Sequence, residues 1–267
     1  MTAALEIETH GRLRVLRLNR PERKNALDGE LMGGLYEAFR AAAHDDDVWA
    51  LAITGNGDAF CSGLDLDQSS DDSDAKASAD DEPHDDRDEP NHFSLLMRVN
   101  CEKPILAGVN GVAVGIGLSL AMNADIRIAA PSARFHPGYA RVATSPDGGL
   151  TWTLTRAVGY ERAMRFLLEQ RMLSATEALA LGLVSEVTDS DEGFEARILE
   201  YGSMLASVAP IAARQTKRML VQIDQPPDLG AHLDREIELA LHGLASRDSA
   251  EAIRAMYAKE RPEFMGE

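Results

Sequence analysis

The stretch Asn110-Gly-Val-Ala-Val-Gly-Ile-Gly-Leu118 decides how this chain folds, because its glycines connect a short apolar strand to the start of a helix. On its N-terminal side, Phe93–Val99 is predicted as a helix and Pro104–Val109 as a strand. On its C-terminal side, Ile116–Asn123 is predicted as a helix and Ile126–Ala129 as another strand. A strand, a helix and a further strand in this order are typical of parallel pairing. The stretch therefore predicts an α/β fold.

The N-terminal third shows the same alternation. Leu5–Thr9 and Leu13–Leu18 alternate apolar and polar residues on either side of a glycine turn, which predicts a hairpin. The apolar residues of Leu27–His44 recur at helical spacing, and Val48–Thr54 is a short apolar strand. Repeated units of similar size favour a spiral of stacked ββα turns over one flat sheet, although the pattern is compatible with both.

The last third is predicted to be largely helical. Ser174-Ala-Thr-Glu177 is a capping box that opens a helix, Gly182 is placed to end it, and Leu183–Val187 is a further short strand. Three or four amphipathic helices are expected between Phe194 and about Lys259. Their three-to-four spacing is clearest at Leu229, Leu233, Ile237 and Leu241.

These observations divide the chain into two regions. Residues 1–200 are expected to form the core, and residues 201–267 a helical C-terminal oligomerisation region. Amphipathic helices at the end of a chain pack their apolar faces on the core or on a partner subunit.

Acidic residues are concentrated in residues 67–92. The chain carries a net charge of −17, and this segment holds 11 acidic residues against Lys76 and Arg87. It has almost no large apolar side chains and cannot bury enough surface to offset its ordering entropy, so we expect a mobile loop. His84 and His92 among the aspartates leave a metal site open as an alternative. A solvated charged loop is the simpler interpretation, and we expect no bound metal.

The composition argues against several classes of protein. An acidic surface repels phosphate, so no nucleic-acid partner is expected. No apolar run reaches the roughly 18–20 residues that a membrane span needs, and no secretory signal is visible at the N-terminus. Cys61 and Cys101 are too few for a disulfide framework and are not spaced for metal. We expect a cytoplasmic protein that does not bind membranes.

Two segments carry backbone groups suited to an anionic oxygen. In Ala59-Phe-Cys-Ser-Gly-Leu-Asp-Leu66, Gly63 permits a tight bend, so the following N–H can point outward instead of joining a strand ladder. In residues 110–118, the helix N-terminus offers free N–H groups and a positive dipole end. Each segment alone is a weak signal, since a G-x-G turn also marks close packing of helix and strand. The second segment lacks the full dinucleotide-binding fingerprint.

Taken together and in order, the motifs resemble those of the crotonase, or enoyl-CoA hydratase/isomerase, superfamily, from the N-terminal hairpin to the end of the chain. The resemblance implies a spiral of repeated ββα units with a helical C-terminal section, assembled as a homotrimer or a dimer of trimers. It also implies an acyl-coenzyme A substrate, with coenzyme A as part of the substrate and no separate cofactor. The matching motifs are Leu18-Asn-Arg-Pro-Glu-Arg-Lys-Asn-Ala-Leu27, Phe60-Cys-Ser-Gly-Leu-Asp65, Lys103-Pro-Ile-Leu-Ala-Gly-Val-Asn-Gly111, Ala121–Asp125, Pro146-Asp-Gly-Gly149, Leu154–Gly159, Gly182-Leu-Val184 and Lys259-Glu-Arg-Pro-Glu-Phe264.

The resemblance also implies where the thioester oxygen binds. It would lie between two backbone N–H groups, those of Leu64 and Ile116, which are catalytic candidates although their side chains are aliphatic. The adjoining residues expected to contact the ligand are Ser62, Gly63, Asp65 and Gly115.

Further positions match the family's coenzyme A channel. Lys24 and Ala26 match residues that line it, and Arg23 is a similar but weaker candidate. Lys259 matches a basic position that often reaches the nucleotide phosphates across a subunit interface. For the two lysines, the alternative is a solvated surface charge.

The chain departs from the family at the two glutamates that hydratases use. Ser119 stands at the first position and Tyr139 at the second. Neither side chain acts as a base at neutral pH, so ordinary hydration is not expected.

Asp147 is the carboxylate that remains near the predicted site. It matches the acid/base position of some isomerases of the superfamily, and in the dehalogenase branch a nearby aspartate is the nucleophile. Its alternative role, which does not exclude the first, is an N-cap of the following helix. His136 and Tyr139 are candidates to donate hydrogen bonds to the substrate, although His136 fits a buried structural histidine equally well.

The leading prediction is an enzyme that moves the double bond of an enoyl-CoA, with Asp147 as acid and base. The alternatives within the superfamily are hydration, thioester hydrolysis and carbon–carbon cleavage. A non-catalytic acyl-CoA binder and a metalloprotein built on the acidic loop are alternatives of other classes.

Overall fold

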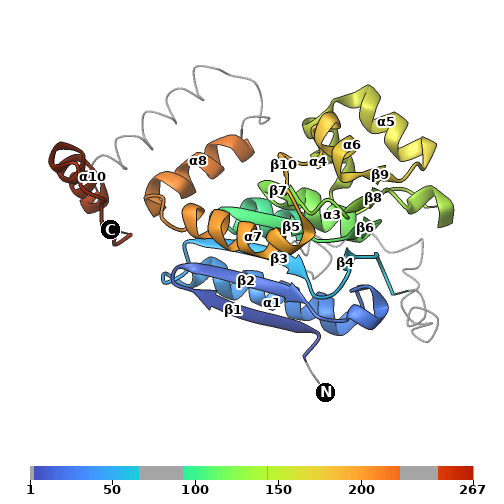
Figure 1. The fold of residues 1–267 in the computed structure, drawn as a ribbon, viewed down its shortest axis with the longest axis horizontal. Helices are drawn as coiled ribbons and strands as arrows, with labels where there is room; N and C mark the ends of the chain where they lie inside the picture. Colours follow the sequence, from blue (N-terminus) through green and yellow to red (C-terminus); the bar gives the residue numbers. More distant parts are fainter. Residues whose placement is uncertain (1–2, 66–92, 143, 223–245, 267) are drawn as a thin grey trace, which may run out of the picture.

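The computed structural model describes residues 3–65, 93–142, 144–222 and 246–266, and their strands form two sheets (Figure 1). The larger sheet has six strands in the order β1-β2-β3-β5-β7-β10, and the smaller has four in the order β4-β6-β8-β9. The strands are β1 (Leu5–His10), β2 (Leu13–Leu18), β3 (Ala50–Gly55), β4 (Ala59–Cys61), β5 (Ile105–Val109), β6 (Val112–Val114), β7 (Ile126–Ala129), β8 (Arg134–His136), β9 (Leu173–Ser174) and β10 (Glu186–Val187).

The pairing of the strands shows a repeated unit. β1 and β2 form the expected antiparallel hairpin, and from β2 onward the neighbours in the larger sheet are parallel. β3, β5 and β7 are each followed, after a short turn, by a strand of the smaller sheet, namely β4, β6 and β8. Because this step from one sheet to the other recurs, the structure confirms a spiral of ββα units and not one flat sheet.

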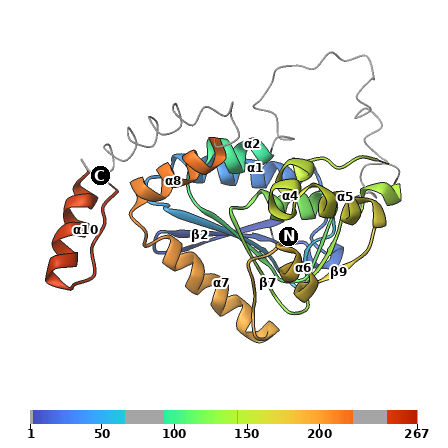
Figure 2. The ribbon, with the colours of Figure 1, turned by 90° about the horizontal axis from the view of Figure 1, so that it is seen from above.

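Helices cover both faces of the larger sheet. Figure 2 shows α7 on one side of this sheet and α1 and α8 on the other, whereas α4, α5 and α6 gather beside the smaller sheet. α10 lies at one end of the molecule, next to the C-terminus (Figures 1 and 2). The described helices are η1 (Pro21–Arg23), α1 (Gly29–His44), α2 (Phe93–Leu95), η2 (Leu96–Asn100), α3 (Ile116–Asn123), η3 (Tyr139–Val142), α4 (Leu150–Val158), α5 (Tyr160–Glu169), α6 (Ala175–Leu181), α7 (Asp191–Leu205), α8 (Pro210–Gln222) and α10 (Arg247–Ala258).

Alternate residues of the central strands face different helices. In β2, Leu13 and Val15 belong to the cluster that includes Ile198 of α7, whereas Leu16 belongs to the cluster that includes Leu35 of α1. All five side chains are fully buried. A sheet covered on both faces needs apolar residues at every position, which explains why the parallel strands are continuous apolar runs.

Local capping signals fix several helix ends. The carboxylate of Asp28 accepts a hydrogen bond from the N–H of Leu31, so α1 begins at Gly29, slightly later than its apolar periodicity predicts. The capping box of Ser174 and Glu177 forms as predicted, and Gly182 ends α6 in the left-handed conformation.

The predicted helix Phe93–Val99 is not uniformly α-helical. α2 gives way to η2, which is a π-helical turn. The Nζ of Lys217, in α8, donates a 2.7 Å hydrogen bond to the main-chain oxygen of Met97. This contact joins residues far apart in the sequence, so the contact could not be predicted from local apolar periodicity.

Two other boundaries differ from the prediction. The strand expected over Leu183–Val187 shortens to β10, because the N–H of Leu183 still closes the preceding helix by donating to the main-chain oxygen of Ala178. The boundary expected at residue 200 falls inside α7, which packs on the larger sheet. The division into a core and an oligomerisation region stays a prediction.

Some predicted features lie outside the described residues. These are the acidic loop of residues 67–92 with His84 and His92, and the spaced apolar residues Leu229, Leu233, Ile237 and Leu241. In the part of the chain that the structure describes, no helix is long and apolar enough to cross a membrane.

Candidate active site

A cavity of about 480 Å³ lies where the smaller sheet meets α3 and the segment before α4. Residues 62–64 and 114–116, from the two glycine-containing segments identified in the sequence, line it. Its lining comes from α1, α2, the ends of β4 and β6, η3 and the loop that follows η3. The lining residues are Met32, Ser62, Gly63, Leu64, Phe93, Val114, Gly115, Ile116, Gly138, Tyr139, Thr144, Asp147 and Gly148.

The N–H of Leu64 is directed away from the neighbouring chain segment. The N–H of Leu27 donates to the main-chain oxygen of Gly63 at 2.8 Å, and the N–H of Asp65 donates to that of Leu27 at 2.9 Å. In such a parallel bridge, the N–H of the central residue points to the opposite side. Gly63 makes the bend possible with a φ of 108°, a value that side-chain-bearing residues rarely adopt.

The N–H of Ile116 is available for a different reason. Ile116 is the first residue of α3, and the first N–H groups of a helix have no partner within that helix. Gly115 precedes it with a φ of 56° and provides no side-chain cap. Leu64 and Ile116 both line this cavity, and their role as the two backbone donors stays a prediction.

Ser119, Tyr139 and Asp147 form a connected hydrogen-bond network. The hydroxyl of Tyr139 donates to Oδ1 of Asp147 at 2.6 Å, and Oγ of Ser119 lies 2.8 Å from the same hydroxyl oxygen. Ser119 is fully buried and Tyr139 almost so, whereas Asp147 is exposed at the cavity. Ser119 and Tyr139, which the sequence comparison places at the two expected glutamate positions, therefore contact each other, and Tyr139 contacts the Asp147 carboxylate.

Tyr139 is held in its protonated form. Burial of the phenol raises its pKa, and the hydrogen bond to the Asp147 carboxylate raises it further, whereas the Ser119 hydroxyl lowers it. At neutral pH the phenol is a hydrogen-bond donor and not a base.

The N-cap alternative for Asp147 is wrong. α4 begins at Leu150, its N-cap is Gly149, and no side chain caps it. The carboxylate that would have capped the helix accepts the Tyr139 hydroxyl instead.

Hydrogen bonds from two helices hold the segment that carries Asp147. The main-chain oxygen of Gly148 accepts hydrogen bonds from Oγ of Ser94, in α2, at 2.7 Å and from Nδ2 of Asn123, in α3, at 2.8 Å. Neither donor was predicted from the sequence. Asn123 stands in the predicted helix without any special pattern, and Ser94 follows the acidic segment.

His136 does not line the cavity. It is buried, and its Nε2 lies 2.9 Å from the main-chain oxygen of Gln170. The structure thus places it in the second of its two expected roles, as a buried histidine with a backbone partner.

Of the residues expected at the ligand, Asp65 and Ala26 do not line the cavity and belong to the turn beside it. The carboxylate of Asp65 is buried and pairs with Arg20 at 2.8 Å, and Arg20 also donates to the main-chain oxygen of Ala26 at 2.6 Å. Ser62 lines the cavity, and its N–H donates to the main-chain oxygen of Lys24. Arg20 was missed as a structural residue, although the Asn-Arg-Pro motif contains it.

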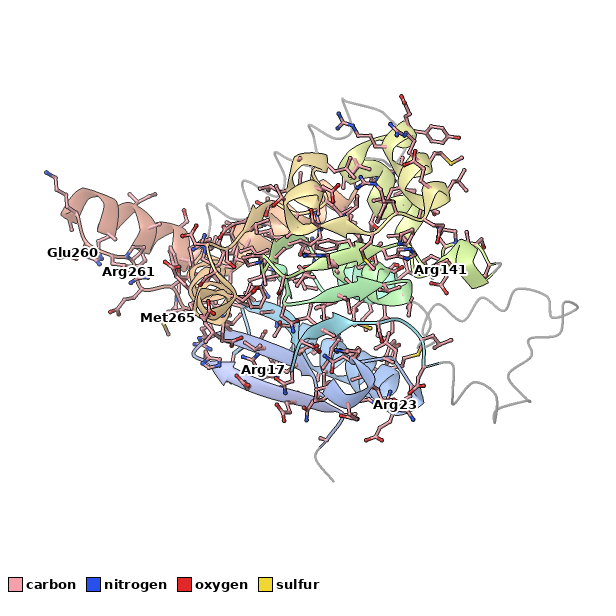
Figure 3. The ribbon with its side chains drawn as sticks, turned by 45° about the vertical axis from the view of Figure 1, so that its right-hand side comes forward. Arg17, Arg23, Arg141, Glu260, Arg261 and Met265 are labelled. Carbon is pink, nitrogen blue, oxygen red and sulfur yellow. The ribbon has the colours of Figure 1, made fainter. Side chains whose placement is uncertain are left out.

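The basic candidates lie outside the cavity. Lys24 is half exposed and forms an ion pair with Asp58. Figure 3 shows Arg23 at the opposite end of the molecule from Glu260 and Arg261, which follow Lys259 directly in the sequence. A single chain therefore does not bring Lys259 to the same site as Arg23.

Metal and thiol chemistry find no support in the described part of the chain. Within it, no group of three or more His, Cys, Asp or Glu side chains could hold a metal ion. Cys61 and Cys101 are both buried free thiols, and burial raises the pKa of Cys61 to about 12, which leaves it unreactive at neutral pH.

Comparison with known proteins agrees with these observations. The Enoyl-CoA hydratase/isomerase family profile matches residues 8–267. The chain is 33% identical over 253 residues to a 1,2-epoxyphenylacetyl-CoA isomerase of Escherichia coli K12, covering 94% of each chain. It is 34% identical over 262 residues to a 2,3-dehydroadipyl-CoA hydratase of the same organism, covering 98% of each.

A solved structure leads to the same conclusion. The crystal structure of an enoyl-CoA hydratase from Polaromonas sp. JS666 superposes with a TM-score of 0.86 at 28% identity, covering 98% of this chain and 99% of the other. The fold, the order of the motifs and these relatives agree along nearly the whole length of the chain. The protein belongs to the enoyl-CoA hydratase/isomerase family.

Proposed function

We propose that the protein moves the double bond of an enoyl-CoA thioester, with Asp147 as both acid and base. One observation carries this proposal: of the described residues that line the cavity, Asp147 alone has a carboxylate. Isomerisation needs one group that removes a proton and returns it elsewhere, whereas hydration in this family uses two carboxylates. Ser119 and Tyr139 supply neither of those two.

The backbone donors would stabilise the charge that develops during proton removal. When the α-carbon of a 3-enoyl-CoA loses its proton, the electron pair moves through the thioester and the double bond to give a dienolate. Its oxygen would lie between the N–H groups of Leu64 and Ile116. Preorganised donors of this kind lower such barriers by roughly 3–4 kcal/mol each.

Asp147 would complete the reaction by returning the proton. Its carboxylate accepts the α-proton and becomes a carboxylic acid. The same acid then protonates the γ-carbon, and the electrons of the dienolate settle into a double bond conjugated with the thioester. The carboxylate is regenerated, and no further reactant is consumed.

Two assays, one of isomerisation and one of hydration, test this function in the unmodified protein. Conversion of a 3-enoyl-CoA series of increasing chain length to the 2-enoyl isomers is expected, with little hydration of crotonyl-CoA. Liquid chromatography of the thioesters separates the products. Brisk hydration of crotonyl-CoA without isomerisation would show that the interpretation of Ser119 and Tyr139 is wrong, and binding without turnover of any ester would favour a non-catalytic binder.

We also propose that the chain assembles in the cytoplasm as a homotrimer or a dimer of trimers. An apolar groove of about 530 Å³, between α8 and α4, is lined in part by Met122, Ala157 and Leu220, and Leu220 is largely exposed. Such a surface is a candidate subunit contact. In an assembly, Lys259 could serve the coenzyme A site of a neighbouring subunit, which a single chain does not permit.

Light scattering tests this assembly. We expect a molar mass of three or six times the 29.0 kDa of one chain. A mass equal to one chain at micromolar concentration would contradict the proposal. Lys259 could then not contact a coenzyme A bound to a neighbouring subunit.

A further inference from the structure

We propose that Tyr139 and Ser119 are positioning residues that form a reversible hydrogen-bond chain behind Asp147 and serve it in both of its protonation states. The inference rests on the proposed function, because a single acid/base group must exist in both states during one turnover. In this proposal the hydrogen-bond partner of the Tyr139 hydroxyl is Asp147 and not the substrate.

The hydrogen-bond chain comprises four contacts. Oδ1 of Asp147 lies 2.6 Å from the Tyr139 hydroxyl oxygen, which lies 2.8 Å from Oγ of Ser119. Oγ of Ser119 lies 3.1 Å from the main-chain oxygen of Asp147 and 3.3 Å from that of Gly115. The hydrogen-bond chain therefore starts at the exposed carboxylate, passes through the buried Ser119 and ends at two main-chain carbonyl groups, which can only accept.

When Asp147 is ionised, the direction of the chain is fixed. A carboxylate only accepts hydrogen bonds, so the Tyr139 hydroxyl must donate its single hydrogen to Oδ1. Tyr139 then has no hydrogen left for Ser119, and Ser119 must donate to the Tyr139 oxygen. Both hydroxyl groups point toward Asp147 and stabilise its negative charge through a charge-assisted hydrogen bond.

When Asp147 carries the substrate's proton on Oδ1, the same atoms support the opposite direction. The carboxylic acid donates to Tyr139, Tyr139 donates to Ser119, and Ser119 donates to the main-chain oxygen of Asp147 or Gly115. Every hydrogen still has an acceptor within 3.3 Å. Neither state leaves a buried polar hydrogen unpaired, which would otherwise penalise that state.

The raised pKa of Tyr139 agrees with this arrangement. A phenol that keeps its proton can donate to Asp147 while accepting from Ser119, or donate to Ser119 while accepting from Asp147. Ser119 is buried in α3, where it contacts Tyr139 but does not line the cavity. Ser119 therefore acts on Asp147 through Tyr139.

The experiment is a double-mutant cycle of Tyr139→Phe and Ser119→Ala, with kcat and KM measured on the 3-enoyl-CoA that the wild-type protein isomerises fastest. Tyr139→Phe keeps the ring and removes the hydroxyl, and kcat should fall roughly ten- to hundredfold, as expected for a lost hydrogen bond to a charged group. KM should stay within about threefold, because the ring that lines the cavity is retained. Ser119→Ala should lower kcat by a smaller factor.

The double variant distinguishes a coupled hydrogen-bond chain from two substitutions that affect packing independently. If Ser119 acts through Tyr139, the double variant should be no slower than Tyr139→Phe by more than about twofold, since coupled residues are not additive. Multiplicative losses would overturn the proposal, as would an unchanged kcat in Tyr139→Phe. Thr153→Val is the matched control, because Thr153 is buried and its hydroxyl bonds to Gly149 outside the chain.

The same assay on Asp147→Asn distinguishes the two proposals. If Asp147→Asn retains full turnover, the proposed function fails and the chain has no acid/base group to serve. If Asp147→Asn is inactive but the Tyr139 and Ser119 variants are fully active, only the hydrogen-bond chain is refuted. Circular dichroism of each variant confirms that it is folded.

Discussion

Replacing Asp147 by asparagine should slow the conversion of 3-enoyl-CoA to 2-enoyl-CoA by roughly 10²–10⁴-fold, the usual contribution of a general acid/base group. The amide has nearly the same shape as the carboxylate and its oxygen can still accept the hydrogen bond from Tyr139, so the site should keep its geometry. It cannot take up a proton from the α-carbon. Turnover under saturating substrate measures the effect.

The affinity for the thioester should change little in this variant. The backbone donors of Leu64 and Ile116 remain, so the dissociation constant for a CoA ester, measured by calorimetry, should stay within a few-fold of the wild-type value. Asp189→Asn is a matched control, since Asp189 is exposed between β10 and α7 and does not line the cavity. Unchanged turnover in Asp147→Asn would eliminate Asp147 as the acid/base group.

Replacing Gly117 by alanine should damage the oxyanion site through its backbone. A Cβ on Gly117 would lie 2.3 Å from the main-chain oxygen of Cys61 and 2.7 Å from its Sγ, so α3 and β4 would have to separate. Gly117 follows Ile116, and Cys61 leads into Gly63 and Leu64, so this separation moves the two N–H groups apart. We expect kcat to fall roughly 10²–10³-fold, as when an oxyanion donor is lost.

The same substitution should also reduce stability. Overpacking of a close contact costs about 1–3 kcal/mol in the free energy of unfolding, which urea denaturation measures. Gly33→Ala is the control, because a Cβ at Gly33 meets no atom within 4 Å and alanine suits the interior of α1 better than glycine. We expect it to leave kcat unchanged and to raise the free energy of unfolding by about 0.5–1 kcal/mol. A Gly117→Ala protein with wild-type kcat would contradict the assigned donors.

Features set by neighbouring residues were predictable from the sequence. The bounds of α3 and β7 match the prediction, and the capping box that opens α6 forms as expected, because apolar periodicity and capping residues act within a few positions. The glycine bends before Leu64 and Ile116 belong to the same class. A positive φ is a local requirement that glycine meets.

Features set by distant contacts were not predictable in the same way. β9 has two residues, too few to show a period, and exists because Leu173 pairs with Phe135. The contact between Ser119 and Tyr139 joins α3 to η3, and nothing in either segment alone indicates it. Asp147 shows the limit most clearly, because Asp-Gly-Gly before a helix resembles an N-cap, and only the tertiary structure supplies the Tyr139 hydroxyl as its partner.

A crystal structure of the Asp147→Asn variant with 3-enoyl-CoA bound tests the central claim most directly. We predict the thioester oxygen at roughly 2.7–3.1 Å from the backbone nitrogens of both Leu64 and Ile116. The side chain of residue 147 should lie about 3–3.5 Å from the α-carbon, with the γ-carbon on the same side. A thioester oxygen bound elsewhere, or a residue 147 remote from both carbons, would contradict the account.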